Sequence, residues 1–118
     1  MKKEKFSEIE KAIDKKQLDK AHLELSKLGP EFLNDPDYLY LRGKIFYLNN
    51  LYYLAIDTLF IALEFDEKDK IFNLLSEIYK ELGNESFSKK LKDVNLRRES
   101  VKEIKAYQTG AFRKNNTN

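Results

Sequence analysis

An apolar pattern recurs in this chain after 34 residues. Within each copy the spacings are three, four and three residues, which place the side chains on one face of an α-helix. Self-similarity at such a period is typical of repeated supersecondary units, so the offset predicts an internal repeat of helical units. Four positions match at this single offset: Leu18 with Tyr52, Ala21 with Ala55, Leu25 with Leu59 and Leu28 with Ala62.

The first helix pair is predicted over residues 3–28, with a polar break at 15–17. Gly29 is expected to adopt the left-handed conformation that commonly ends a helix, and Pro30 cannot continue one. Asp35 is expected to cap the next helix, because its carboxylate can accept hydrogen bonds from the free amides of the first turn.

The second pair is predicted over residues 35–69, with a short polar break at 49–50. The helix after that break is apolar around much of its circumference, which indicates that it is buried on both sides or carries an interface. Tyr53 and Phe60 lie seven residues apart on one face of it, and this face is a candidate surface for self-association or for a second partner. Small residues, which let two helices approach closely, occur at Gly43, Ala55 and Ala62.

The third pair is predicted to begin near residue 69 and matches the pattern only roughly, at a shift of 33 residues. The core positions of its second helix are expected at Phe87, Leu91 and Val94. Lys90 stands where the small residue of the repeat should be. This unit is therefore interpreted as degenerate, with about two extra residues in its turn.

The last predicted helix continues past residue 95 and ends near Gly110, and residues 111–118 are predicted to be disordered. Terminal elements of repeat proteins are atypical because they present a polar outer face to solvent. A basic face can also dock an acidic partner, nucleic acid or an anionic membrane. Val101, Ile104 and Tyr107 keep helical spacing, and the basic face comprises Arg97, Arg98, Lys102 and Lys105.

Composition excludes several functional classes. The chain has no cysteine, which excludes disulfides and cysteine-based metal or redox chemistry. Its N-terminus lacks the apolar core of a signal peptide, and no uninterrupted apolar run of about 18 residues is present, so no transmembrane segment is expected. These features predict a cytoplasmic protein. The formal net charge of +2 and the lack of a known reader motif argue against a nucleic-acid partner.

Catalytic chemistry has no candidate residues in this sequence. His22 is the only histidine, and neither a nucleophile nor an orienting partner marks it as a catalytic base. Glycine-rich phosphate loops, HExxH motifs and calcium-loop spacings do not occur. We therefore expect no enzymatic activity, no metal site and no cofactor.

The central unit resembles a tetratricopeptide repeat (TPR). Departures from that pattern are Leu39 at the tryptophan position, Arg42 before the glycine and Glu67 at the closing proline. The resemblance implies an all-α fold, a TPR-like α-solenoid of three stacked antiparallel helix pairs with an extended C-terminal helix, over residues 1–110. The matching positions are Gly43, Phe46, Tyr52, Ala55, Leu59 and Ala62.

In this family the first helices of the pairs line a concave groove that commonly holds a peptide or a partner helix. The resemblance implies groove-facing positions at Phe6, Glu10 and Ile13 in the first unit, at Asp37, Tyr40, Lys44 and Tyr47 in the second, and at Lys70, Asn73, Glu77 and Lys80 in the third. Of these, the residues expected to contact a protein partner are Tyr40, Lys44, Tyr47, Asn73, Glu77 and Lys80.

Two alternatives stay open at the groove and at the level of function. Tyr40 and Tyr47 could instead fill gaps between adjacent first helices. The clamp with which some family members grip chaperone C-termini is absent, since Phe6 and Glu10 occupy its first-unit positions. The sequence predicts a non-catalytic interaction module, an adaptor or assembly factor. The alternative is a structural subunit that self-associates through the second-helix face and the C-terminal helix.

Overall fold

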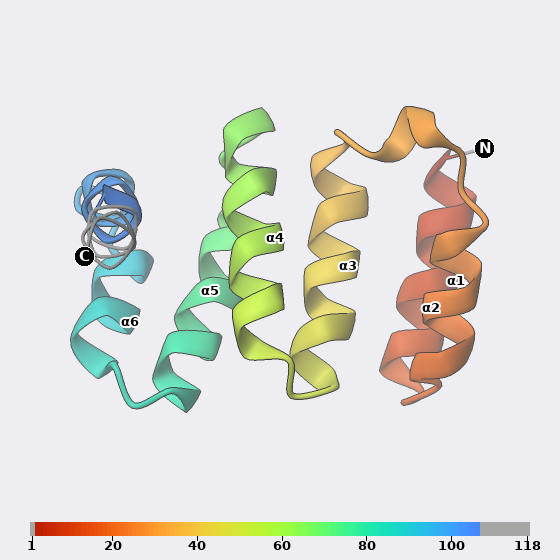
Figure 1. Cartoon of the computed structure of the whole chain (residues 1–118), viewed down its shortest axis with the longest axis horizontal. Coiled ribbons are helices and arrows are strands. Elements are labelled where there is room, and N and C mark those ends of the chain that lie inside the picture. The colour runs from red at the N-terminus through yellow and green to blue at the C-terminus, as the bar shows by residue number, and fades with distance from the viewer. Residues whose placement is uncertain (1, 107–118) are drawn as a thin grey trace, which may run out of the picture. The chain divides into compact units, whose positions relative to one another are not determined.

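The computed structural model describes residues 2–106, which form helices joined by turns and contain no strand (Figure 1). The predicted all-α fold is therefore confirmed for these residues. None of the helices in this part of the chain has the length and apolar character needed to cross a membrane. The predicted helix end at Gly110 and the predicted tail at 111–118 lie outside the described residues. The helices are α1 (Lys2–Asp14), α2 (Leu18–Ser26), a short 3-10 helix (Pro30–Phe32), α3 (Pro36–Leu48), α4 (Tyr52–Phe65), α5 (Asp69–Glu81), α6 (Glu85–Lys92) and a helical segment at 97–106.

The chain forms two compact units, and the boundary between them falls inside α5, between Leu74 and Leu75. In the first unit α1 contacts α2 and α3, α2 contacts α3, and α3 contacts α4. Its core is built from the apolar stripes that the sequence predicted, with Ile9, Ala21 and Leu59 fully or almost fully buried. Helix α3 contacts α1, α2 and α4, so it is the central element of this unit.

Three helix–turn–helix hairpins with matching bounds make up most of the described chain. Helices α1, α3 and α5 each have 13 residues, and each is followed by a three-residue connection to the next helix. In each connection the middle residue has a positive φ: 62° at Lys16, 64° at Asn50 and 85° at Gly83. These residues lie 34 and then 33 positions apart. The predicted lengthening of the third turn is therefore wrong. This turn has three residues like the other two, and the period is one residue shorter because α4 together with the connection before α5 is shorter than α2 with its connection to α3.

Hydrogen bonding in the three turns is also the same. The left-handed residue donates its N–H to the carbonyl three positions earlier, and the next residue donates to the carbonyl five positions earlier, which satisfies carbonyls at the helix end. The donor–acceptor pairs are Lys16–Ile13 and Gln17–Ala12, Asn50–Tyr47 and Leu51–Phe46, and Gly83–Lys80 and Asn84–Tyr79.

Small residues bring the two helices of a hairpin together, as the sequence predicted. A Cβ on Gly43 would come within 2.9 Å of the Leu59 side chain, and Ala55 is fully buried. In the third hairpin this role belongs to Ser76 and Ser88, whose hydroxyls lie 2.8 Å apart and each donate to the other residue's carbonyl, at 2.7 Å. Ser88, and not Lys90, is therefore the small residue of that hairpin.

The expectation of one continuous last helix is wrong. Helix α6 ends at Lys92, and Asp93 adopts an extended conformation. The Asp93 carboxylate accepts a hydrogen bond from the Asn95 N–H at 2.8 Å, and its carbonyl accepts from Arg97 at 2.9 Å, so Asp93 starts the separate segment at 97–106. Val94, expected in the core, lies in this break and is 72% exposed.

Gly29 also differs from expectation. Its φ is −72°, so the left-handed conformation predicted there does not occur. Helix α2 has already ended at Ser26, and the 3-10 helix starting at Pro30 carries the chain to Asp35. The predicted cap is confirmed, since the Asp35 carboxylate accepts hydrogen bonds from the N–H groups of Asp37 (2.8 Å) and Tyr38 (3.3 Å).

Candidate functional site

One face of α3 gathers the candidate residues of the second hairpin. Asp37, Tyr40, Lys44 and Tyr47 are spaced three, four and three residues apart, so they lie along the same side of the helix. Capping by Asp35 starts α3 at Pro36, which fixes this register. All four side chains are half-buried, and they are therefore held by neighbours while remaining accessible.

Tyr40 lies between two lysines. The Nζ of Lys70, from the first turn of α5, is 4.7 Å from the centre of the Tyr40 ring, and the Nζ of Lys44 is 6.0 Å from it. A cation at this distance from an aromatic ring is attracted by the negative face of the π system. The ring and the two ammonium groups therefore form one surface, to which we refer as the Tyr40 platform.

Asp37 forms an ion pair with Lys70, one of the two lysines next to Tyr40. Its Oδ1 accepts hydrogen bonds from Lys68 Nζ at 2.8 Å and forms an ion pair with Lys70 Nζ at 2.9 Å. Partial burial of the Asp37 carboxyl raises its pKa, but the hydrogen bonds and positive charges of Lys68 and Lys70 outweigh burial and lower the pKa to about 2. Asp37 is therefore ionised at neutral pH.

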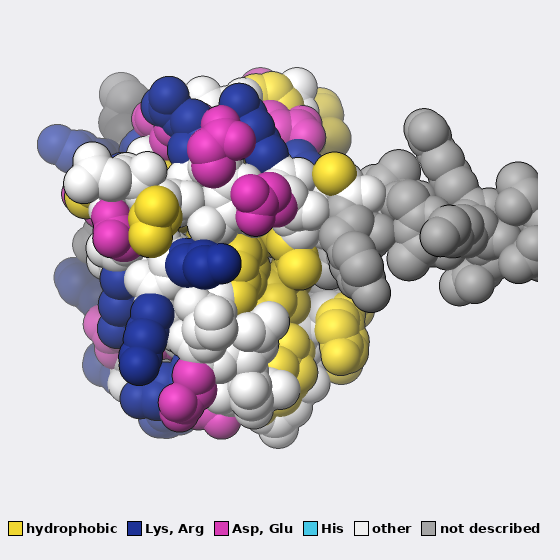
Figure 2. Space-filling view, turned by 90° about the vertical axis from the view of Figure 1, so that its left-hand side faces the viewer, with side chains coloured by type: hydrophobic (Ala, Val, Ile, Leu, Met, Phe, Trp, Pro, Cys, Tyr) yellow, Lys and Arg dark blue, Asp and Glu magenta, His cyan; other side chains and the backbone are white. Residues whose placement is uncertain are grey.

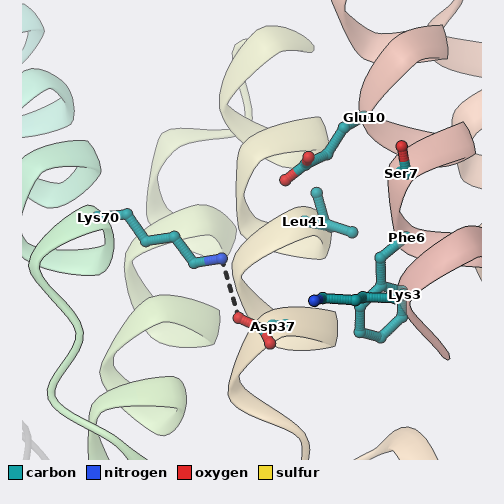
Figure 3. Close-up of a pocket in the computed structure, with 7 residues that line it drawn as sticks. All are labelled: Lys3, Phe6, Ser7, Glu10, Asp37, Leu41 and Lys70. Atoms are coloured by element: carbon teal, nitrogen blue, oxygen red, sulfur yellow. Dashed lines mark ion pairs between the residues drawn. The ribbon is translucent and has the colours of Figure 1, made fainter.

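A pocket of about 260 Å³ lies between α1 and α3, next to this ion pair (Figure 3). Figure 3 shows Lys3 and Glu10 extending from α1 toward α3, and Lys70 reaching Asp37 from α5. The volume is below the roughly 300–1,000 Å³ of small-molecule sites and suits a single side chain. The lining residues are Lys3, Phe6, Ser7, Glu10, Asp37, Leu41 and Lys70.

The predicted groove residues of α1, and Tyr47 of α3, lie in different environments. Phe6 and Glu10 line the pocket, and the Phe6 ring also packs against Phe32 at 5.7 Å. Ile13 is only 3% exposed and belongs to the core, so its predicted groove position is wrong. Tyr47 packs its ring against Tyr52 of α4, with centroids 5.8 Å apart, so this contact lies within its own hairpin, whereas the alternative left open by the sequence concerned a gap between adjacent first helices.

Three of the four predicted groove residues of α5 are exposed, and Lys70 is partly buried. Asn73, Glu77 and Lys80 follow one another at spacings of four and three residues, so they share one side of this helix. Asn73 belongs to the first unit, as do Tyr40, Lys44 and Tyr47, whereas Glu77 and Lys80 belong to the second.

Sequence reasoning missed four residues around the pocket. Lys3 and Ser7 could have been found, because they share a helix face with Phe6 and Glu10 at spacings of three and four. Lys68 could not, since it lies 31 residues from Asp37 and only packing brings the two together. The fourth residue is Leu41, which is buried in the pocket wall.

His22 is exposed on α2, and among residues 2–106 no group of three or more His, Cys, Asp or Glu side chains could hold a metal ion. The Tyr40 platform and the pocket offer an aromatic face, ammonium donors, carboxylates and the apolar side chains of Phe6 and Leu41.

Helix α4 carries a second exposed surface, the α4 stripe, formed by Leu54, Ile61 and Phe65. These side chains are 46–50% exposed and lie seven and four residues apart. The predicted exposed face is right for Tyr53, which is 72% exposed, and wrong for Phe60, which is only 5% exposed. Phe60 lies at the edge of the buried arc and turns into the core.

The predicted basic face of the last helix is mixed in charge. Arg98 and Lys102 are exposed, but Lys102 lies 3.6 Å from the Glu99 carboxylate, and Glu103 is exposed on the same segment. Figure 2, which faces this end of the chain, shows basic and acidic side chains interspersed. Both signs of charge on one surface weaken the attraction for a polyanion.

Compared with known proteins, the chain matches no protein-family model, no curated protein and no solved structure.

Proposed function

We propose that this protein is a non-catalytic interaction module of the TPR type, which holds a peptide or a helix of another protein against α3. The observation that carries the proposal is the Tyr40 platform beside a pocket sized for one side chain. Rigid aromatic side chains with a polar tip are frequent energetic anchors of protein interfaces. The predicted contact residues Lys44 and Tyr47 lie on the same helix face.

The repeated hairpins support this reading. The equal lengths of their first helices, the shared backbone geometry of their turns and the close packing at Gly43 and Ala55 fit a stack of three helix pairs. In such a stack the first helices of the pairs, here α1, α3 and α5, line one side. The pocket lies between two of these helices and receives Lys70 from the third.

The proposal is tested by affinity capture from the native lysate followed by mass spectrometry. Wild type is compared with the double variant Tyr40→Ala/Tyr47→Ala and with Tyr53→Ala, a matched control on the exposed face of α4. A partner retained by wild type and by Tyr53→Ala but lost by the folded double variant is the expected result. A partner held equally by all three proteins would place binding elsewhere and refute the α3 surface.

A second candidate function is self-association through the α4 stripe. Three large apolar side chains lie on one narrow band of a helix, next to the exposed Asp57, and can pack against the same band of a second copy about a two-fold axis. The variant Ile61→Lys places a charge in the middle of the stripe. Sedimentation equilibrium should show wild type as a dimer and Ile61→Lys as a monomer, whereas a monomeric wild type would dismiss this candidate.

A further inference from the structure

We propose that the ligand of the α3 surface is an acidic peptide segment, whose Asp or Glu side chains meet the lysines of the Tyr40 platform while a neighbouring apolar side chain enters the pocket. The inference rests on the proposed function and names the class of partner. Binding of this kind needs acidic side chains along the segment, and it does not need a free C-terminal carboxylate.

Charge around the surface is the first argument. Four lysines meet here: Lys3 and Lys70 line the pocket, Lys44 and Lys70 flank Tyr40, and Lys68 pairs with Asp37. Two carboxylates oppose them, Glu10 in the pocket wall and Asp37. The surface therefore carries an excess of positive charge although it contains acidic groups, and complementarity favours a negatively charged ligand.

The second argument is the way in which Asp37 holds its two lysines. Both ammonium groups meet the same oxygen, Oδ1, and an ammonium group has three N–H donors. Lys70 can therefore keep its ion pair with Asp37 and still donate to a ligand carboxylate, because 40% of its side chain is exposed. The ion pair holds the lysine in place, which reduces the entropy lost when a ligand binds.

The pocket supplies the apolar half of the recognition. Phe6 and Leu41 give it apolar walls, and its volume of about 260 Å³ accepts one side chain. Its charged residues include Lys70, which also touches the Tyr40 ring. If an apolar and an acidic side chain are neighbours in the ligand, the first can therefore enter the pocket while the second contacts Lys70 beside it.

A nucleic-acid strand would use the same lysines and stack on the same tyrosine, but it fits less well. The carboxylates of Glu10 and Asp37 repel phosphates and peptide carboxylates alike, so the number and spacing of the cations decide between the two ligands. Strands bound without sequence preference also need a positively charged groove that follows several nucleotides, and the platform offers one tyrosine and few cations.

The experiment is a selection of random short peptides on the immobilised full-length protein, followed by affinity measurements on the enriched peptides with amidated C-termini. Enriched sequences should combine Asp or Glu with an apolar residue. Their affinity should fall by about tenfold or more in Lys44→Glu, and less in Lys44→Gln, because reversal adds repulsion to the lost attraction. Lys20→Glu makes the same charge change on exposed α2 and should bind as wild type does.

Each outcome decides between defined readings. Peptides that depend on Tyr40 and Tyr47 but show no acidic preference would overturn this inference and leave the α3 surface in place. Acidic peptides that bind Lys44→Glu as well as wild type, or that need a free C-terminal carboxylate, would also overturn it. Tighter, Tyr40-dependent binding of a single-stranded oligothymidine would assign the surface to nucleic acid. If no peptide depends on the two tyrosines, the proposed function itself fails.

Discussion

At the residue scale, Gly43 shows how tightly α3 and α4 pack. A methyl group at this position would lie 2.9 Å from Cγ and Cδ2 of Leu59, which is fully buried and has no room to move. Replacement of a helical glycine by alanine normally gains roughly 0.5–1 kcal/mol, but overpacking costs about 1–3 kcal/mol. We expect Gly43→Ala to lower the free energy of unfolding by about 1 kcal/mol in urea titrations.

The matched control for this prediction is Asn73→Ala, an exposed helical site where alanine meets no neighbour in the core. It should leave stability unchanged or raise it by a few tenths of a kcal/mol. A Gly43→Ala protein as stable as this control would show that the two helices do not approach as closely as described.

Asp37 makes stability depend on pH. Because folding lowers the pKa of this carboxyl from 3.8 to about 2, its contribution is present above pH 4 and is lost as the pH falls toward 2. The partly exposed lysines reduce this contribution to roughly 1–2 kcal/mol. At pH 7 Asp37→Asn should therefore be less stable than wild type by about this amount, and near pH 2 the two proteins should be equal.

Chemical denaturation at several pH values measures this difference. Asp57→Asn, which changes an exposed carboxylate on α4, is the control and should follow wild type throughout. A constant difference between Asp37→Asn and wild type from pH 7 to pH 2 would contradict the assigned ion pairs.

At the scale of elements, the three turns share their backbone hydrogen bonds and differ in how well their middle residue tolerates a left-handed backbone. This conformation costs a lysine roughly 1 kcal/mol or more and a glycine almost nothing. Lys16→Gly should therefore stabilise the protein by about 0.5–1 kcal/mol, and Gly83→Ala should destabilise it by a similar amount. A Cβ at Gly83 has no neighbour within 4 Å, so its effect is purely conformational. Opposite signs in thermal melts confirm the shared turn, and equal signs contradict it.

Helix starts and turns could be predicted from the sequence because their signals are local. The break at 15–17 and the cap at Asp35 need only neighbouring residues. The end of α6 could not be predicted in this way. The apolar spacing continues from Leu91 to Val94, and only the bonds made by Asp93 reveal that a new segment starts there.

The candidate site could be predicted only in part, for a related reason. The repeat offset and the family resemblance led to Phe6, Glu10, Asp37 and Lys70, which line the pocket. They could not reveal that Asp37 pairs with lysines more than 30 residues away. In α4 apolar residues occur on every side, so periodicity alone could not decide that Phe60 is buried and Ile61 exposed.

At the scale of the whole molecule, one hairpin design appears three times and carries two different surfaces. The α3 face combines an aromatic ring, lysines and a pocket, which suits a ligand with both charged and apolar groups. The α4 stripe is uncharged and suits an apolar partner such as itself. Under the proposed function the two surfaces are independent, so a variant of the α4 stripe should retain peptide binding.

The most direct test of the proposed binding surface is a heteronuclear NMR titration of the isotope-labelled protein with a fragment of its captured partner. Binding to α3 predicts that the perturbed amides cluster around Phe6, Tyr40, Lys44 and Lys70. Perturbations centred on Leu54, Ile61 and Phe65, with the α3 face unchanged, would contradict the account.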